Sequence, residues 1–304
     1  MVYTVTISPA LDYALKLESL DEGMILRAIS ENLYAGGKGI NVSNVLTQLE
    51  IPNVALGFVA GFTGAEIERR AHLLGVKTDF IRLPQGNSRI NVKIRTADGT
   101  ETAINARGCG IDDESLNEFY GKIDALGTGD FLVLSGSVPE SLPDDVYEAI
   151  LRRLCGKQAH CIVDAAGPLL RNALKCKPFL IKPNLEELCG LFGQAAETEN
   201  AVFNLAKSLQ CEGARNVLVS MGAEGSLLLT EAGERIRAPL ARAATASTVG
   251  AGDSMVAGFL AGWLKYGDYQ KALALGTAAG AATAFSEGIA KRGEIERVFE
   301  SLEY

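Results

Sequence analysis

A glycine-rich segment that ends in an aspartate is the part of the sequence best suited to chemistry. It reads Ser247-Thr-Val-Gly-Ala-Gly-Asp253 and precedes a long apolar run. Gly250, Ala251 and Gly252 would expose backbone N–H groups at a helix start, which favours anion binding. Asp253 beside such a site could accept a proton from an attacking hydroxyl. The alternative is that Asp253 caps the helix N-terminus.

A second glycine-rich segment, Gly36-Gly37-Lys38-Gly39-Ile40-Asn41, also precedes a predicted helix. Its glycines would let a sugar or phosphate approach the backbone closely. Lys38 supplies a positive charge, and Asn41 can pair with hydroxyls. The segment is not a Walker motif, because Lys38 is followed by glycine rather than Ser or Thr. A tight turn with a helix start is the simpler alternative.

Further candidates follow other predicted strands. Asp12, just beyond the first strand, could bind sugar hydroxyls or belong to a turn. Arg27, Arg89 and Arg107 could each bind a phosphate through paired hydrogen bonds, or lie on the surface as most arginines do.

Two more segments combine polar and turn residues. In Lys182-Pro-Asn-Leu-Glu-Glu187 the spacing places Asn184 and Glu187 on one helical face. This pair could bind Mg²⁺ together with substrate phosphates, or form a capping box, or do both. The turn Ser220-Met-Gly-Ala-Glu-Gly225 could hold a nucleotide phosphate or simply turn a hairpin.

Composition excludes several classes of protein. The 304 residues carry a net charge of −8 and are 47% hydrophobic, which is typical of a globular chain. The acidic balance argues against a nucleic-acid partner. The start of the chain does not resemble a signal peptide, and the longest apolar stretches, 255–264 and 272–286, are too short to span a membrane. Six cysteines without a CxxC pair then indicate reduced thiols in the cytoplasm.

Alternating strands and helices are expected to position these residues. Apolar runs predict strands at 2–7, 53–61, 131–136, 161–165, 179–184 and 216–222, with helices between them. This alternation indicates an α/β fold with a mostly parallel sheet covered on both faces. In such sheets ligands bind beyond the carboxyl ends of the strands. Residues 89–105 predict a hairpin with Asp98-Gly99 at its turn.

In this order along one chain, the motifs closely resemble the PfkB carbohydrate kinase family, nearest to its 1-phosphofructokinases and tagatose-6-phosphate kinases. The resemblance covers essentially the whole chain, through SPALD (8–12), GGKGIN (36–41), RINVKI (89–94), SGSVP (135–139), IKPNLEEL (181–188), SMGAEG (220–225) and STVGAGDSMVAG (247–258). One departure is Cys109, where relatives usually have proline after the glycine.

The resemblance implies a ribokinase-like three-layer α/β/α sandwich. Residues 1–304 would form a single kinase domain with a small β lid from about 11–34 and 88–106, through which such proteins often form homodimers. It also implies ATP and Mg²⁺ as cofactors.

The same resemblance assigns roles to individual residues. Asp253 would be the general base, with Gly250, Ala251 and Gly252 as the anion hole. Asn184 and Glu187 would hold the metal. The positions matched to the nucleotide are Lys182, Asn184, Ser220, Gly222, Gly225 and Thr248. Those matched to the substrate are Asp12, Gly37, Lys38, Asn41 and Arg89, with Ser137 nearby. Arg27 and Arg107 are added as substrate-binding candidates because they could bind its phosphate.

The expected reaction is ATP-dependent phosphorylation of D-fructose 1-phosphate to D-fructose 1,6-bisphosphate. Tagatose 6-phosphate is the main alternative substrate, and fructose 6-phosphate is a third. A non-catalytic sugar-phosphate sensor on the same fold is the alternative from a different class. Retention of Asp253 and of the Asn184/Glu187 pair argues against a sensor.

Overall fold

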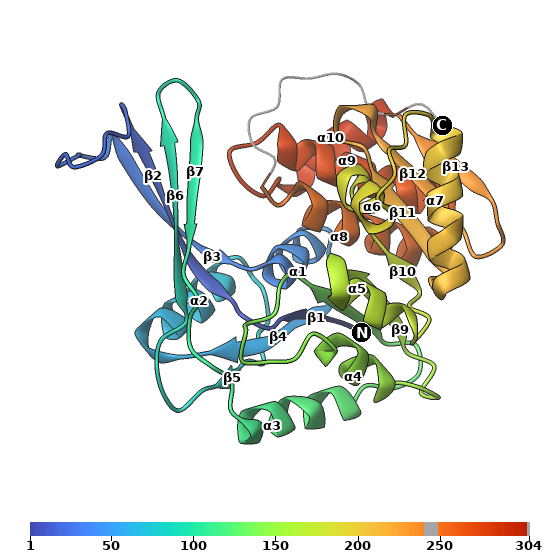
Figure 1. Ribbon diagram of the computed structural model, residues 1–304, viewed down its shortest axis with the longest axis horizontal. Helices are drawn as coiled ribbons and strands as arrows, with labels where there is room; N and C mark the ends of the chain where they lie inside the picture. Colours follow the sequence, from blue (N-terminus) through green and yellow to red (C-terminus); the bar gives the residue numbers. More distant parts are fainter. Residues whose placement is uncertain (240–248, 303–304) are drawn as a thin grey trace.

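A nine-stranded, mostly parallel sheet forms the centre of the molecule (Figure 1). We describe residues 1–239 and 249–302 of a computed structural model. The strands of this sheet are β1 (Val2–Thr6), β4 (Asn53–Val59), β5 (Ile81–Arg82), β8 (Phe131–Ser135), β9 (His160–Asp164), β10 (Leu180–Ile181), β11 (Asn216–Ser220), β12 (Ser226–Leu229) and β13 (Arg235–Ala238). Their order is β13-β12-β11-β10-β9-β8-β1-β4-β5. Neighbouring strands are parallel except in the pairs β11–β12 and β12–β13, which are antiparallel.

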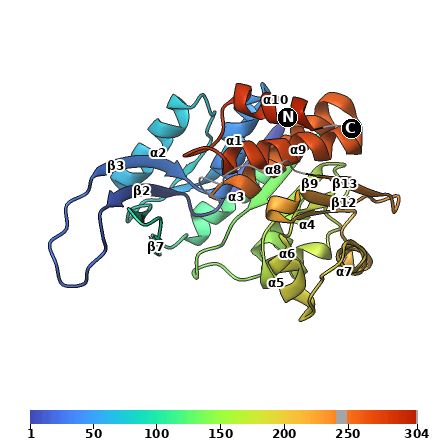
Figure 2. The same ribbon diagram turned by 90° about the horizontal axis from the view of Figure 1, so that it is seen from above.

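Helices cover both faces of this sheet, as Figure 2 shows. One face carries α3 (Asp113–Asp124), α4 (Val146–Arg152), α5 (Gly167–Leu174), α6 (Leu185–Phe192) and α7 (Glu199–Glu212). The other face carries α1 (Lys38–Gln48), α8 (Ala251–Tyr266), α9 (Tyr269–Ala284) and α10 (Arg292–Ser301). In β8, Leu132 and Leu134 pack on the first group and Val133 on the second, because strand side chains alternate. The predicted three-layer sandwich is confirmed.

A separate four-stranded sheet extends from one side of this body (Figure 1). It is formed by β2 (Ala10–Leu17), β3 (Ser30–Gly36), β6 (Arg89–Thr96) and β7 (Glu101–Asn105), and α2 (Gly61–Leu73) lies beside its base. Leu11 and Ala35 of this small sheet pack against Ile67 of α2. The predicted hairpin is β6–β7, and Asp98 accepts a hydrogen bond from the Thr100 N–H (3.0 Å) at its turn.

Two predicted segments can be compared in detail with the structure. The strand expected at 179–184 is only two residues long, Leu180–Ile181. Pro183 has no N–H to continue the ladder, so the regular strand ends and only an isolated bridge between Asn184 and Ser220 follows it. The turn at 220–225 joins β11 to the antiparallel strand β12 and therefore does turn a hairpin.

The two apolar stretches near the C-terminus lie in α8 and α9, which pack closely together. No helix among the described residues is long and apolar enough to cross a membrane. Gly258 of α8 lies where a Cβ would be 2.6 Å from the Leu275 carbonyl oxygen and 2.7 Å from the Ala279 Cβ. The absence of a side chain at this position is what lets the two helices approach.

We expect Gly258→Ala to lower the free energy of unfolding by about 1–3 kcal/mol, because the added methyl group forces α8 and α9 apart. The control is Gly121→Ala in α3, where a Cβ would meet nothing within 4 Å. That variant should gain about 0.5–1 kcal/mol from helix propensity. Chemical denaturation measures both, and equal stabilisation of the two variants would contradict the close helix contact.

Candidate active site

Most of the predicted site residues line a single cavity of about 860 Å³ between the carboxyl ends of the central strands and the small sheet. The predicted residues that line it are Asp12, Gly37, Lys38, Asn41, Arg89, Ser137, Lys182, Asn184, Glu187, Ser220, Gly222, Gly225, Gly250, Ala251, Gly252 and Asp253. The fold therefore brings together segments from both ends of the chain.

Three predicted residues are not placed there. Arg27 is exposed on the connection between β2 and β3 and does not line the cavity. Arg107 pairs with Glu140 at 3.3 Å, and both side chains are more than four-fifths exposed, at 86% and 81%. Thr248 lies outside the described residues.

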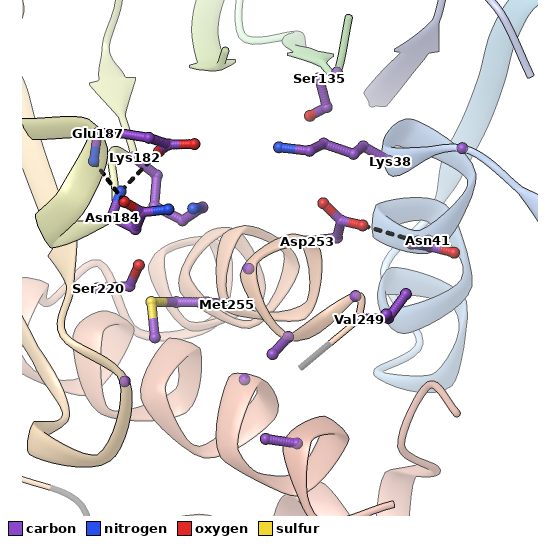
Figure 3. A pocket seen from close by; sticks show the side chains of 18 of the residues that line it. Lys38, Asn41, Ser135, Lys182, Asn184, Glu187, Ser220, Val249, Asp253 and Met255 are labelled. Carbon is purple, nitrogen blue, oxygen red and sulfur yellow. Dashed lines mark hydrogen bonds between the residues drawn. The ribbon is translucent and has the colours of Figure 1, made fainter. Parts of the chain in front are cut away.

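Asp253 lies in the first turn of α8 and is only 5% exposed. The Asn41 amide donates a hydrogen bond to its Oδ2 at 2.8 Å (Figure 3). Burial raises the pKa of Asp253 to about 6, and the nearby charge of Asp164 acts in the same direction. The N-cap of α8 is Gly250, so the alternative that Asp253 caps this helix is wrong. A carboxylate with this pKa is chemically suited to accept a proton near neutral pH.

The backbone conformation at position 250 favours glycine. Its φ of 80° is in the left-handed region, and a Cβ would lie 2.5 Å from the Ile289 Cδ1. The following residues begin α8, so their N–H groups point out of the helix start into the cavity, beside Asp253. This arrangement can stabilise negative charge on a ligand.

Asp164, at the carboxyl end of β9, links two lysines of the site. Lys38 Nζ lies 3.1 Å from its Oδ2, and Lys182 Nζ lies 3.2 Å from its Oδ1. Burial opposes its charge, but the two lysines lower its pKa overall. We assigned Asp164 no role from the sequence, and its place at the carboxyl end of a strand was the available signal.

Asn184 and Glu187 form the predicted capping box at the start of α6. The Glu187 N–H donates to Asn184 Oδ1 (2.7 Å), and the Asn184 N–H donates to Glu187 Oε2 (2.9 Å). In Figure 3 this pair faces Lys38 and Asp253 across the cavity. The described residues contain no group of three or more His, Cys, Asp or Glu that could hold a metal. Amide and carboxylate oxygens are ligand types that Mg²⁺ takes in small number together with water and phosphate oxygens.

The small sheet contributes a second polar group. Asp12 accepts hydrogen bonds from the Asn91 amide (2.9 Å) and the Lys93 ammonium (2.6 Å). Arg89 donates from Nε to the Ser8 carbonyl at 3.1 Å, and burial lowers its pKa. We assigned no role to Asn91 or Lys93 from the sequence, although strand alternation places them on the same face as Arg89.

Comparisons with known proteins agree with this geometry. The chain is 39% identical over 302 residues to 1-phosphofructokinase of Bacillus subtilis, covering 99% of this chain and 98% of the relative. It is 33% identical over 304 residues to D-tagatose-1-phosphate kinase of Bacillus licheniformis, covering 100% and 99%.

Solved structures show the same fold. A variant of phosphofructokinase-2 from Escherichia coli superposes with a TM-score of 0.92 at 25% identity, covering 99% of this chain and 98% of that one. Arabidopsis thaliana ribokinase, solved with ribose and ATP, gives a TM-score of 0.79 at 21% identity over 98% of each chain. The family model of pfkB carbohydrate kinases matches residues 5–293, and the chain belongs to this family.

Proposed function

We propose that this kinase transfers the γ-phosphoryl group of ATP to the 6-hydroxyl of D-fructose 1-phosphate and forms D-fructose 1,6-bisphosphate. Membership of the family supports a sugar kinase that uses ATP. Full-length relatives named 1-phosphofructokinase support this acceptor. The observation that carries the proposal is the buried Asp253 at the start of α8, with Lys38 and Asn41 beside it in the cavity.

The acceptor hydroxyl would bind next to Asp253, which takes its proton as the oxygen attacks the γ-phosphorus. The bond from that phosphorus to the β,γ-bridging oxygen breaks, and ADP leaves. Charge on the transferring group would be stabilised by the N–H groups at Gly250, Ala251 and Gly252 and by Lys38. Asn41 holds the Asp253 carboxylate in orientation. Positioning and charge stabilisation are the main work in such a transfer.

The opposite side of the cavity would bind the nucleotide. Lys182 offers a cation to its phosphates, and the turn with Ser220, Gly222 and Gly225 lies at the same end of the sheet. Asn184 and Glu187 would hold Mg²⁺. Glu187 Oε2 accepts the Asn184 N–H in the cap, which leaves the second carboxylate oxygen available for the ion. When bound, Mg²⁺ neutralises part of the phosphate charge.

The small sheet, with residues 11–34 and 88–106, would act as a lid that excludes water during transfer. We further propose that two copies associate through it. Met24, Ile25 and Ile29, on the connection between β2 and β3, are 69%, 95% and 56% exposed, which is unusual for apolar side chains. A cytoplasmic location is consistent with six cysteines that form no disulfide.

D-tagatose 1-phosphate is a second candidate acceptor, because full-length relatives carry that name. The sequence-based alternative was tagatose 6-phosphate, whose phosphate lies at the other end of the sugar. Fructose 6-phosphate remains the third candidate.

Coupled ADP release with Mg²⁺ and ATP tests the proposal. We expect the highest kcat/KM with fructose 1-phosphate among that sugar, tagatose 1-phosphate, tagatose 6-phosphate, fructose 6-phosphate and fructose. Preference for another sugar phosphate would change the substrate assignment, and preference for unphosphorylated fructose would contradict a phosphate-binding site. Tight binding of a sugar phosphate without turnover would support a sensor.

Asp253→Asn should lower kcat by at least about 100-fold while leaving sugar-phosphate binding near normal. In the wild type, kcat/KM should fall as the pH drops below about 6, because protonation of Asp253 removes the base. Near-normal turnover of the variant would contradict the assignment.

A stability measurement controls for misfolding of this variant. The fold raises the pKa of Asp253, so its charge opposes folding at pH 8. Asp253→Asn should therefore have a higher Tm than wild type at pH 8. This gain should shrink as the pH falls through about 6 toward the ordinary value of 3.8.

Glu187→Gln separates the capping role from the metal role. The Gln side-chain oxygen can still accept the hydrogen bond from the Asn184 N–H, so we expect an unchanged Tm. Loss of the charge should raise the Mg²⁺ concentration for half-maximal activity by about tenfold or more. The control is Glu186→Gln, an exposed residue one position away, which should change neither quantity. An unchanged Mg²⁺ requirement in Glu187→Gln would rule out the metal role.

A further inference from the structure

Strand β6 places a buried, unpaired amide oxygen beside the cavity. Asn91 is 7% exposed, lines the cavity and donates from Nδ2 to Asp12 Oδ1 at 2.9 Å. Because a carboxylate can only accept, this bond fixes the amide orientation and turns Oδ1 away from Asp12. Within the described part of the chain, Asn91 Oδ1 is buried and has no hydrogen-bond partner. Such an acceptor is costly unless a ligand or a bound water supplies a donor.

Lys93 follows Asn91 on the same face of β6 and also lines the cavity. Its Nζ lies 2.6 Å from Asp12 Oδ2, and its side chain is 34% exposed. An ammonium group has three N–H donors, so the pairing with Asp12 leaves donors for a ligand. Without this cation the carboxylate of Asp12 would repel an anionic substrate.

The charges elsewhere in the cavity favour Lys93 for this task. Lys38 and Lys182 both pair with Asp164 at the carboxyl end of the central sheet. Arg107 pairs with Glu140 away from the cavity. Lys93 lies on the small sheet instead, on the acceptor side of the proposed reaction. Arg89 is the other lining cation on this strand face, and its Nε is already bonded to the Ser8 carbonyl oxygen.

We propose that Asn91 and Lys93 form a recognition subsite on β6, in which Asn91 Oδ1 accepts a hydrogen bond from a sugar hydroxyl and Lys93 binds the phosphate that the acceptor already carries. The subsite selects a phosphorylated sugar over its unphosphorylated form. This inference rests on the proposed function and adds the residues that determine its substrate class.

The test for Lys93 is Lys93→Met, which removes the charge but keeps a similar length. We measure kcat/KM for fructose 1-phosphate and for fructose, at enzyme concentrations that give measurable turnover of both. The preference for the phosphorylated sugar should fall by roughly 10- to 100-fold, the usual effect of losing a hydrogen bond to a charged group. Arg95→Met is the matched control, because Arg95 lies two residues further along β6, outside the cavity, and pairs with Glu101.

Equal losses on both sugars would overturn the phosphate role and show that Lys93 only positions Asp12. If the wild type turned over no sugar phosphate, the proposed function itself would fail. Calorimetry would then test the subsite without turnover, by measuring the affinity for fructose 1-phosphate. Weaker binding to Lys93→Met than to the wild type supports the subsite, and unchanged binding overturns it.

The test for Asn91 uses deoxy analogues of fructose 1-phosphate, each lacking one ring hydroxyl. The wild type should bind one analogue roughly 10-fold more weakly than the parent sugar, because Asn91 Oδ1 then loses its donor. Asn91→Ala should bind that analogue and the parent sugar equally. The hydroxyl contact would be wrong if Asn91→Ala still bound each weakly binding analogue less tightly than the parent sugar by the same factor as the wild type.

Discussion

The buried carboxylate of Asp164 is the charge on which the rest of the site depends. It is 1% exposed and pairs with Lys38 and Lys182, which reach it from different segments of the chain. A charge this deeply buried is stable only when it is paired, and each of the two lysines is in turn held in one position. The same pairing places two cations near the carboxylate of Asp253. The segments that bear Lys38, Lys182 and Asp253 thus share one electrostatic centre.

The parallel sheet makes this centre possible. Neighbouring strands end at the same edge, so β8, β9 and β10 deliver Ser135, Asp164 and Lys182 to one place. Lys38 and Asp253 come from the first turns of α1 and α8, whose N-termini open toward the same cavity. Helix N-termini offer unpaired backbone N–H groups, and the ends of the strands add polar side chains. This edge of the sheet therefore suits anionic ligands.

The small sheet adds what the central sheet cannot supply. Its cavity face carries Asp12, Arg89, Asn91 and Lys93, and its opposite face packs near its base on α2. A mixture of one carboxylate with cations and an amide suits a ligand that combines hydroxyls with a phosphate. In the proposed function, the central sheet binds the nucleotide phosphates and the small sheet adds the groups that distinguish one acceptor from another.

Local patterns in the sequence were sufficient for much of this structure. The apolar strands, the β6–β7 hairpin at Asp98-Gly99 and the Asn184/Glu187 capping box depend on residues close together in the chain. Their physical causes, side-chain periodicity and local hydrogen bonding, are present in any short segment. The order of the motifs also identified the family.

Tertiary structure alone decided which charged groups meet. Lys38 and Asp164 are 126 positions apart, and Asn41 and Asp253 are 212 apart. No local pattern specifies such pairs, because they depend on strand order and on the direction of each helix start. The same reason explains why Arg27 and Arg107 lie away from the cavity while Asn91 and Lys93 line it. The sequence alone determined the elements and the chemistry available, and packing determined which side chains share the buried space where that chemistry is possible.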